Sequence, residues 1–495
     1  MTVAPHGIDH LTPLQKRELL ARLAAERQAQ PRHVPLSFAQ ERLWFLDQLA
    51  PGSAFYNQNL AMRADRALDD QLLARALDEV VARHASLRTT FEAVDGRPVQ
   101  IVHAALTIPV RVVDLTSLPE AEREEQVGLL AVEEGIEPFD LATGPLLRAT
   151  LVQVAADESV LLLTLHHIVS DGWSVAVLLN ELQVAYEAFA AGRPSPLAPL
   201  KLQYTDYAVW QRSWLKGEVL DRQRAWWRER LQDLPRLDLP LDRPRPEVSS
   251  YRGAYHAVEV PESVVARLRA LATHEGATPF IVLLAAFQAL LARYSGQDDV
   301  VVGVPVANRG RAELEPLIGF FVNTLVMRVD LSGDPSFRDA LRRVKEVALG
   351  AQANQDVPFE QLVHELQPER DTSRNPLFQV SFQLFNAPAA TDAQPVAGFA
   401  LQPMAVERGT SNLDLAFDLY EGEGGLSGTI EYSTDVFEAP TIARMAAHFV
   451  ALLDAVAERP DLPLSSASLL APGDRQLVLE EWNSTAVDYP RQARI

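Results

Sequence analysis

Residues 160–189 constrain the fold of this chain more than any other segment, because the spacing of their apolar residues changes halfway along. Residues 160–165 form a nearly continuous apolar run, which is typical of a central strand buried on both faces. After Gly172 the apolar residues recur at helical spacing as far as Phe189. The segment therefore predicts a strand, a turn over residues 166–172 and a helix. Side chains on such a turn lie at the end of a sheet, where a substrate can reach them.

Other elements alternate in type along the chain, which predicts an α/β (α+β) fold. We expect helices over residues 11–28, 69–85, 262–274 and 279–294, strands over residues 146–154, 255–260 and 300–305, and a hairpin of residues 413–419 and 426–432. Residues 155–159 would form the turn that precedes the buried strand.

The length of 495 residues exceeds what one hydrophobic core usually organises, so two lobes of roughly 200 residues each are expected. A Pro-rich stretch, residues 231–250, is the best candidate for the linker between them. We therefore expect a leader helix and linker over residues 1–34, an N-terminal lobe over residues 35–230 and a C-terminal lobe over residues 251–470. Residues 471–495 follow the second lobe.

Composition excludes several classes of function. The chain has no cysteine, which rules out disulfides, thiolate catalysis and cysteine-ligated metals. Its net charge of −21 argues against nucleic acid and anionic membranes as partners. No apolar run reaches the roughly 18 residues of a membrane helix. The first ten residues show neither a signal peptide nor a transit pattern, so a cytoplasmic location is expected.

The turn at residues 166–172, which reads HHIVSDG, carries the side chains best suited to chemistry. Adjacent side chains on a strand point to opposite faces, so His166 and His167 cannot both face one cavity. A histidine there could transfer protons near neutral pH or orient a nucleophile by hydrogen bonding. Asp171 could fold back to bind backbone or pair with an arginine, and Gly172 would permit a tight turn.

Three other interpretations of this turn stay open on spacing alone. Both histidines could be structural residues beside a buried strand. A metal site is a weaker alternative, because neighbouring ligands on opposite strand faces do not easily share one ion. Serine hydrolase chemistry is weaker still, because Gly172-Trp173-Ser174 lacks the small-residue frame of a nucleophile elbow.

Six further segments accompany the HHxxxDG turn in a fixed order. Residues 37–46 read SFAQERLWFL, 83–91 read RHASLRTTF, 204–210 read YTDYAVW, 318–325 read IGFFVNTL, 354–360 read NQDVPFE and 370–378 read RDTSRNPLF. With these seven motifs, which span about residues 35–382, the chain resembles the condensation domains of nonribosomal peptide synthetases. These domains belong to the chloramphenicol-acetyltransferase-like superfamily.

The resemblance implies a fold and a reaction. The fold would be two chloramphenicol-acetyltransferase-like lobes arranged in a V, with the active site in a central tunnel. The activity would be that of an acyltransferase that forms an amide bond. An aminoacyl amine on a downstream carrier domain would attack an acyl or peptidyl thioester on an upstream carrier. The phosphopantetheine arms of these carriers would hold the substrates, and the domain itself would bind no cofactor and no metal.

The resemblance also implies roles for residues of the turn. His167 would be the main catalytic group, either as a base for the amine or as the residue that positions it. His166 would mainly support the fold. Gly172 would let the backbone approach the substrate.

Asp171 is expected to be structural and to pair with an arginine of the second motif. Arg83 is favoured over Arg88 for this role. The same motif has Ala85 where the family usually has Glu, which weakens any role assigned there.

The subtype follows from finer likenesses. Residues 482–490 resemble the linker to an adenylation domain, so residues 471–495 would lead towards one. The wording of the first and third motifs favours an elongation domain that accepts an L-configured donor, in secondary-metabolite or antibiotic biosynthesis. If Met1 is the natural start, the donor carrier would lie on a separate protein. Starter domains that attach a fatty acyl group, epimerisation domains and catalytically silent carrier-docking modules remain alternatives. Heterocyclisation is disfavoured, because that subgroup has aspartates in place of the histidines.

Overall fold

The computed structural model describes residues 32–366, 371–385, 401–404, 409–422, 424–470 and 476–485. The predicted helix over residues 11–28 and most of segment 471–495 lie outside these ranges. The chain forms two compact units: Met1–Leu220 with Ala307–Val322 and Ala387–Val406, and Asp221–Val306 with Asn323–Asn386 and Glu407–Ile495. It passes from the first unit to the second within helix α7 (Glu218–Leu231), before the Pro-rich stretch. The domain boundaries given above stay a prediction.

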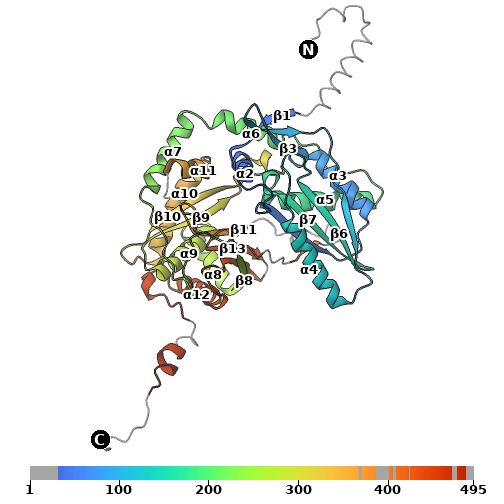
Figure 1. Ribbon diagram of the computed structural model, residues 1–495. Coiled ribbons are helices and arrows are strands. Elements are labelled where there is room, and N and C mark those ends of the chain that lie inside the picture. Colours follow the sequence, from blue (N-terminus) through green and yellow to red (C-terminus); the bar gives the residue numbers. More distant parts are fainter. Residues whose placement is uncertain are drawn as a thin grey trace, which may run out of the picture. The chain divides into compact units, whose positions relative to one another are not determined.

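The first unit contains two sheets and the helices that cover them (Figure 1). Its strands are β1 (Arg32–Pro35), β2 (Asn57–Ala64), β3 (Thr89–Val94), β4 (Arg97–Val102), β5 (Val110–Asp114), β6 (Leu147–Ala155), β7 (Glu158–His166) and β12 (Leu401–Pro403). Its helices are α2 (Phe38–Leu49), α3 (Asp70–Arg83), α4 (Glu120–Ile136), α5 (Gly172–Ala190) and α6 (Tyr204–Trp214), with the short turns η1 (Ala85–Arg88), η2 (His167–Val169) and η3 (Ala312–Leu314). The strand orders are β12-β2-β7-β6-β5 and β1-β4-β3.

Strand β7 is the centre of the five-stranded sheet, as its apolar run predicted. It pairs antiparallel with β2 on one side and with β6 on the other. Leu163 and Leu165 pack into the core cluster that includes residues of α3 and α5. Val160 and Leu162 face the opposite side, where α4 packs across β2 and β7 (Figure 1). Burial on both faces explains why the sequence of β7 does not alternate between apolar and polar residues.

Two details of the first unit differ from the prediction or sharpen it. The turn between β6 and β7 has two residues, Ala156 and Asp157, where we expected five, because strand pairing continues to Ala155 and Glu158. Helix α3 begins after Asp69, whose side chain accepts a hydrogen bond from the Leu72 backbone N–H. This cap satisfies one of the amide groups that a helix start leaves unpaired.

The second unit is a six-stranded sheet of order β10-β9-β11-β13-β14-β8 with helices packed on it. Its strands are β8 (Gly253–Pro261), β9 (Asp299–Val306), β10 (Asn323–Asp330), β11 (Val380–Phe385), β13 (Leu415–Gly422) and β14 (Gly425–Ser433). Its helices are α8 (Glu262–His274), α9 (Pro279–Ser295), α10 (Phe337–Ala353), α11 (Phe359–Leu366) and α12 (Ala439–Glu458), with short turns at Leu464–Ser466 and Leu477–Glu481. The helices, strands and hairpin expected here are confirmed, and so is the mixed α/β class.

Helices α9 and α12 form much of the core of the second unit. Thr278 caps α9, Pro279 occupies its first turn, and Gly296 ends it in the left-handed conformation with φ of 68°. By length and composition α12 could span a membrane, and so could α8 and α9 if they were one span. In the structure, however, α12 packs against α8, α9 and β8, so its apolar face belongs to the core.

Candidate active site

The HHxxxDG turn lies at the end of the central strand, as predicted. Strand β7 ends at His166, the short turn η2 follows, and α5 begins at Gly172. The backbone N–H of His167 donates to the Tyr56 carbonyl over 2.8 Å, which ties the turn to the start of β2. Gly172 is exposed at the first position of α5 and presents no side chain there.

His166 is buried, with 2% of its surface exposed. Its Nδ1 accepts a hydrogen bond from the Ile168 backbone N–H over 3.1 Å. The rings of Tyr56 and Phe139 lie edge-on to the imidazole at centroid distances of 6.3 and 6.2 Å. Burial, with a smaller contribution from neighbouring His167, lowers the pKa of His166 to about 3. His166 is therefore neutral at physiological pH, and its expected role in supporting the fold stays a prediction.

His167 is partly exposed, and contacts with Ser170 and Phe320 help to set the orientation of its ring. Its Nδ1 lies 3.1 Å from the carbonyl oxygen of Ser170. Because a carbonyl only accepts hydrogen bonds, Nδ1 carries the proton in the neutral imidazole, and Nε2 is the basic nitrogen. The ring of Phe320 packs edge-on against the imidazole, at a centroid distance of 5.5 Å and an interplanar angle of 61°.

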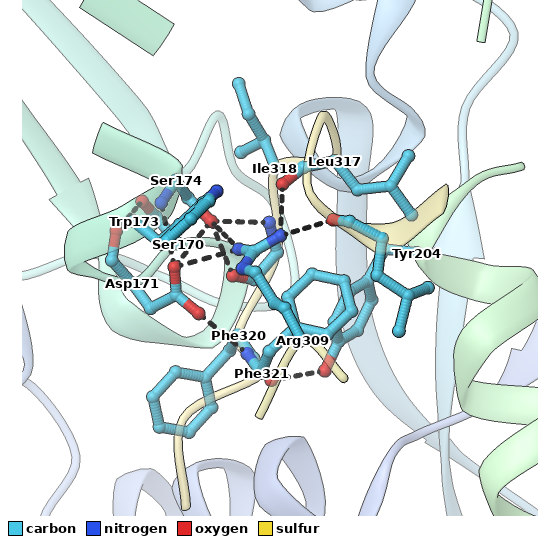
Figure 2. Close-up of polar contacts among 12 residues, drawn as sticks. Ser170, Asp171, Trp173, Ser174, Tyr204, Arg309, Leu317, Ile318, Phe320 and Phe321 are labelled. Atoms are coloured by element: carbon cyan, nitrogen blue, oxygen red, sulfur yellow. Dashed lines mark hydrogen bonds and ion pairs between the residues drawn. The ribbon is translucent and has the colours of Figure 1, made fainter. Parts of the chain in front are cut away.

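Asp171 is fully buried and binds four groups (Figure 2). Its Oδ1 accepts from the Ser174 backbone N–H at 2.8 Å and from Arg309 Nη2 at 3.0 Å, and it lies 2.7 Å from the Ser174 hydroxyl. Its Oδ2 accepts from the Phe321 backbone N–H at 3.0 Å. Asp171 thus caps α5 and at the same time holds a segment that lies far away in the sequence.

The expected partner of Asp171 was wrong: the arginine is Arg309 and not Arg83 or Arg88. Arg83 lies in the last turn of α3, which packs along α5, and its Nε binds the Glu181 carboxylate at 3.0 and 3.1 Å. Glu181 is about 15 Å along the helix from Asp171, at 1.5 Å per residue. Arg88 donates to the His103 carbonyl instead.

Arg309 comes from the segment Ala307–Val322, which belongs to the first unit although it lies between strands of the second. Only 2% of its side chain is exposed. Its Nη1 donates to the carbonyls of Leu314 and Leu317, each at 2.7 Å, and its guanidinium lies 4.0 Å from the centroid of the Phe321 ring. Arg309 therefore joins Asp171 to the backbone of this segment.

The backbone of residues 314–321 is bound by side chains along most of its length (Figure 2). Besides Arg309, four side chains donate to its carbonyl oxygens. Trp173 donates to the carbonyl of Glu315 at 2.9 Å, Ser86 to that of Ile318 at 2.6 Å, Ser174 to that of Gly319 at 2.8 Å and Tyr204 to that of Phe320 at 2.6 Å. Three of its N–H groups donate to side chains. The N–H of Ile318 donates to His84 Nδ1 at 3.3 Å, that of Gly319 to Ser174 Oγ at 3.0 Å, and that of Phe321 to Asp171. We refer to residues 314–321 as the bound segment.

Sequence reasoning finds part of this site. The turn and the segment 318–325 both stand out as motifs, but the sequence does not distinguish Phe320 from a core residue and does not single out Arg309. Nothing in the local pattern marks Arg309, because its significance lies in contacts across 138 positions of sequence. Among the described residues there is no group of three or more His, Asp or Glu side chains that could hold a metal ion.

Comparison with known proteins gives concordant matches. A family model described as "Condensation domain" matches residues 30–479. A linear gramicidin synthase protein of Brevibacillus parabrevis is 50% identical over 462 residues, which cover 93% of this chain. The chain spans only 6% to 9% of the length of the three linear gramicidin synthase proteins that it matches.

Solved structures show the same fold. The X-domain from teicoplanin biosynthesis has a TM-score of 0.78 and 33% identity, covering 89% of this chain and 98% of that one. That X-domain has also been solved in complex with OxyB. The first condensation domain of the calcium-dependent antibiotic synthetase, in complex with a substrate analogue, has a TM-score of 0.74 and 23% identity, covering 89% of this chain and all of that one.

Proposed function

The chain belongs to the condensation-domain family, as its ordered motifs predicted, and from this premise we propose that it forms amide bonds between carrier-bound substrates. The amine of an aminoacyl group on a downstream carrier attacks the thioester carbonyl of an acyl or peptidyl group on an upstream carrier. A C–N bond forms, the C–S bond breaks, and the upstream carrier leaves as its thiol. The lengthened chain remains on the downstream carrier.

The observation that carries this proposal is the contact between His167 Nδ1 and the Ser170 carbonyl, from which the tautomer follows. With Nδ1–H directed at the Ser170 carbonyl, the basic Nε2 can accept a proton from the attacking amine and later return it to the departing sulfur. Proton transfer of this kind contributes roughly 10²- to 10⁴-fold to a rate, and holding two tethered reactants together contributes as much or more. The same nitrogen can orient the amine before it reacts, so the two roles considered for His167 use one geometry.

The partners follow from the reaction. An upstream donor carrier, on the same or a separate protein, and a downstream acceptor carrier with its adenylation domain would supply the substrates on phosphopantetheine arms. This chain matches only 6% of the length of a linear gramicidin synthase protein, which supports a role as one domain among several that handle the substrates. The L-donor elongation subtype, the V-shaped arrangement with its tunnel and the cytoplasmic location stay predictions, with starter acylation as an alternative subtype.

The proposal is tested by mixing the protein with chemically loaded donor and acceptor carriers and measuring the mass of the acceptor carrier by intact-protein mass spectrometry. We expect the condensed product with the natural chain and at least a hundredfold less with His167→Ala. His274→Ala is the matched control, since 74% of that side chain is exposed and it lies at the end of α8. Full product formation by His167→Ala would contradict the assigned role. An inverted α-carbon without condensation would instead indicate epimerisation.

A second candidate is a catalytically silent docking module. It is supported by the likeness to an X-domain that forms a complex with OxyB. This candidate predicts retained carrier binding with no product from any donor, measured by calorimetry and mass spectrometry on the same samples. Product that depends on His167 would exclude it.

A further inference from the structure

The catalytic use of His167 requires that its ring be held in one orientation. The χ2 torsion of a histidine is broad and allows the ring to turn over, which exchanges the positions of the two nitrogens. The hydrogen bond between Nδ1 and the Ser170 carbonyl, at 3.1 Å, holds one edge of this partly exposed ring. A further constraint on the ring would keep Nε2 directed at the substrate.

Phe320 is placed to supply that constraint. Phe320 is 9% exposed, and its ring lies edge-on to the imidazole of His167, at 5.5 Å between the ring centroids. An edge-to-face pair at this separation is attractive and orientation-dependent. The contact therefore restricts rotation of the imidazole as well as its displacement.

The position of Phe320 is itself fixed on both sides. Its own carbonyl accepts from the Tyr204 hydroxyl at 2.6 Å, and the next N–H, that of Phe321, donates to Asp171 at 3.0 Å. Tyr204 is fully buried, and its hydroxyl lies 2.7 Å from Ser37 Oγ, so the donor cannot move away easily. The backbone at Phe320 is thus held more firmly than a buried loop without such bonds would be.

We propose that Phe320 is a positioning residue, which keeps the His167 imidazole in the orientation that presents Nε2 to the amine. This inference rests on the proposed function, because it assigns to Phe320 an effect on the rate that acts through His167. On this proposal, the role of the bound segment is to place the aromatic ring of Phe320 beside His167, although the two residues are far apart in the sequence.

Kinetics with loaded carriers test the proposal. Phe320→Ala should lower kcat on the order of 10- to 100-fold and leave the KM for the acceptor carrier within about twofold, because small misplacements of a catalytic group cost about this much. Phe320→Leu, which restores bulk beside the imidazole but not the edge-to-face pair, should recover only part of kcat. The matched control is Phe189→Ala, which removes a similarly buried ring (7% exposed) about 25 Å along α5. Equal kcat values for Phe320→Ala and Phe189→Ala would overturn the proposal.

A double substitution separates positioning from general damage. If Phe320 acts through His167, then His167→Ala with Phe320→Ala should be no slower than His167→Ala, since the residue to be positioned is gone. A further 10- to 100-fold loss in the double variant would contradict the proposal.

A measurement without turnover distinguishes failure of this inference from failure of the proposed function. The ¹⁵N resonances of the His167 imidazole, identified by their absence in His167→Ala, should report the Nδ1–H tautomer in the natural chain. Phe320→Ala should shift them towards a mixture of tautomers, and Phe189→Ala should not. An unchanged tautomer in Phe320→Ala would refute the positioning role whether or not the chain forms amide bonds.

Discussion

Replacing Asp171 by asparagine tests the central electrostatic contact of the site. The substitution keeps the size of the side chain but removes its charge, and its NH₂ group must face a donor, either the Phe321 N–H or the cluster at Oδ1. Among the described residues, Asp171 is the carboxylate within salt-bridge distance of Arg309, whose side chain is 2% exposed. Breaking a buried pair in this way costs about 3–5 kcal/mol of the free energy of unfolding. We therefore expect Asp171→Asn to destabilise the first unit by that amount.

Urea denaturation of single and double variants measures this energy and identifies the partner. Asp171→Asn combined with Arg309→Met should be less destabilising than the sum of the two, by about 1–3 kcal/mol, because the double variant leaves no unpaired buried charge. The control combines Asp171→Asn with Arg83→Met. Since Arg83 binds Glu181, these two effects should add within about 0.5 kcal/mol. Coupling of Asp171 to Arg83, with none to Arg309, would refute the reasoning.

Two further predictions concern stability. Because burial lowers the pKa of His166 to about 3, against about 6.5 in an unfolded chain, the unfolded state binds more protons between these pH values, so stability falls as the pH is lowered through that window. Between pH 7.5 and pH 5 the natural chain should lose about 2 kcal/mol more than His166→Gln in urea denaturation, and equal losses would contradict the assigned environment. Gly319→Ala should strongly lower the melting temperature, because the new Cβ would lie 2.0 Å from Tyr204 Cδ2. Gly310→Ala, in the same stretch Ala307–Val322, is the control, since its Cβ would meet nothing within 4 Å. Similar melting temperatures for the two variants would count against the packing described.

The elements of the fold could be predicted because their signals are local. The apolar run of β7, the helical spacing of α5 and the Gly424-Gly425 pair at the start of β14 each reflect interactions within a few residues. Pairing order could not be obtained in the same way. Strand β12, for example, pairs with β2 across more than 300 positions of sequence, and no pattern within either strand indicates the other.

The HHxxxDG turn could be located for the same local reason, whereas the partner of its aspartate could not. Asp171 and Gly172 lie where the hydrophobic period changes, so the sequence shows that they are at a strand-to-helix turn. Arg83 was a reasonable candidate because α3 does pack on α5, but a side chain in the last turn of α3 meets Glu181 and not the start of α5. The choice between Arg83 and Arg309 therefore depends on where along α5 each arginine meets the helix, and the two carboxylates lie about 15 Å apart along it.

The bound segment gives a physical reason for the motifs to occur together. Residues 315–321 are not part of a helix or strand, yet Leu317 to Phe321 are buried, so their backbone groups need partners from elsewhere. Some of these donors and acceptors belong to three other motifs: His84 and Ser86 to the second, Asp171 to the HHxxxDG turn and Tyr204 to the fourth. Each buried group left without its partner would cost about 1–3 kcal/mol. The occurrence of these four polar residues in separate motifs is thus explained by the segment that places Phe320 beside His167.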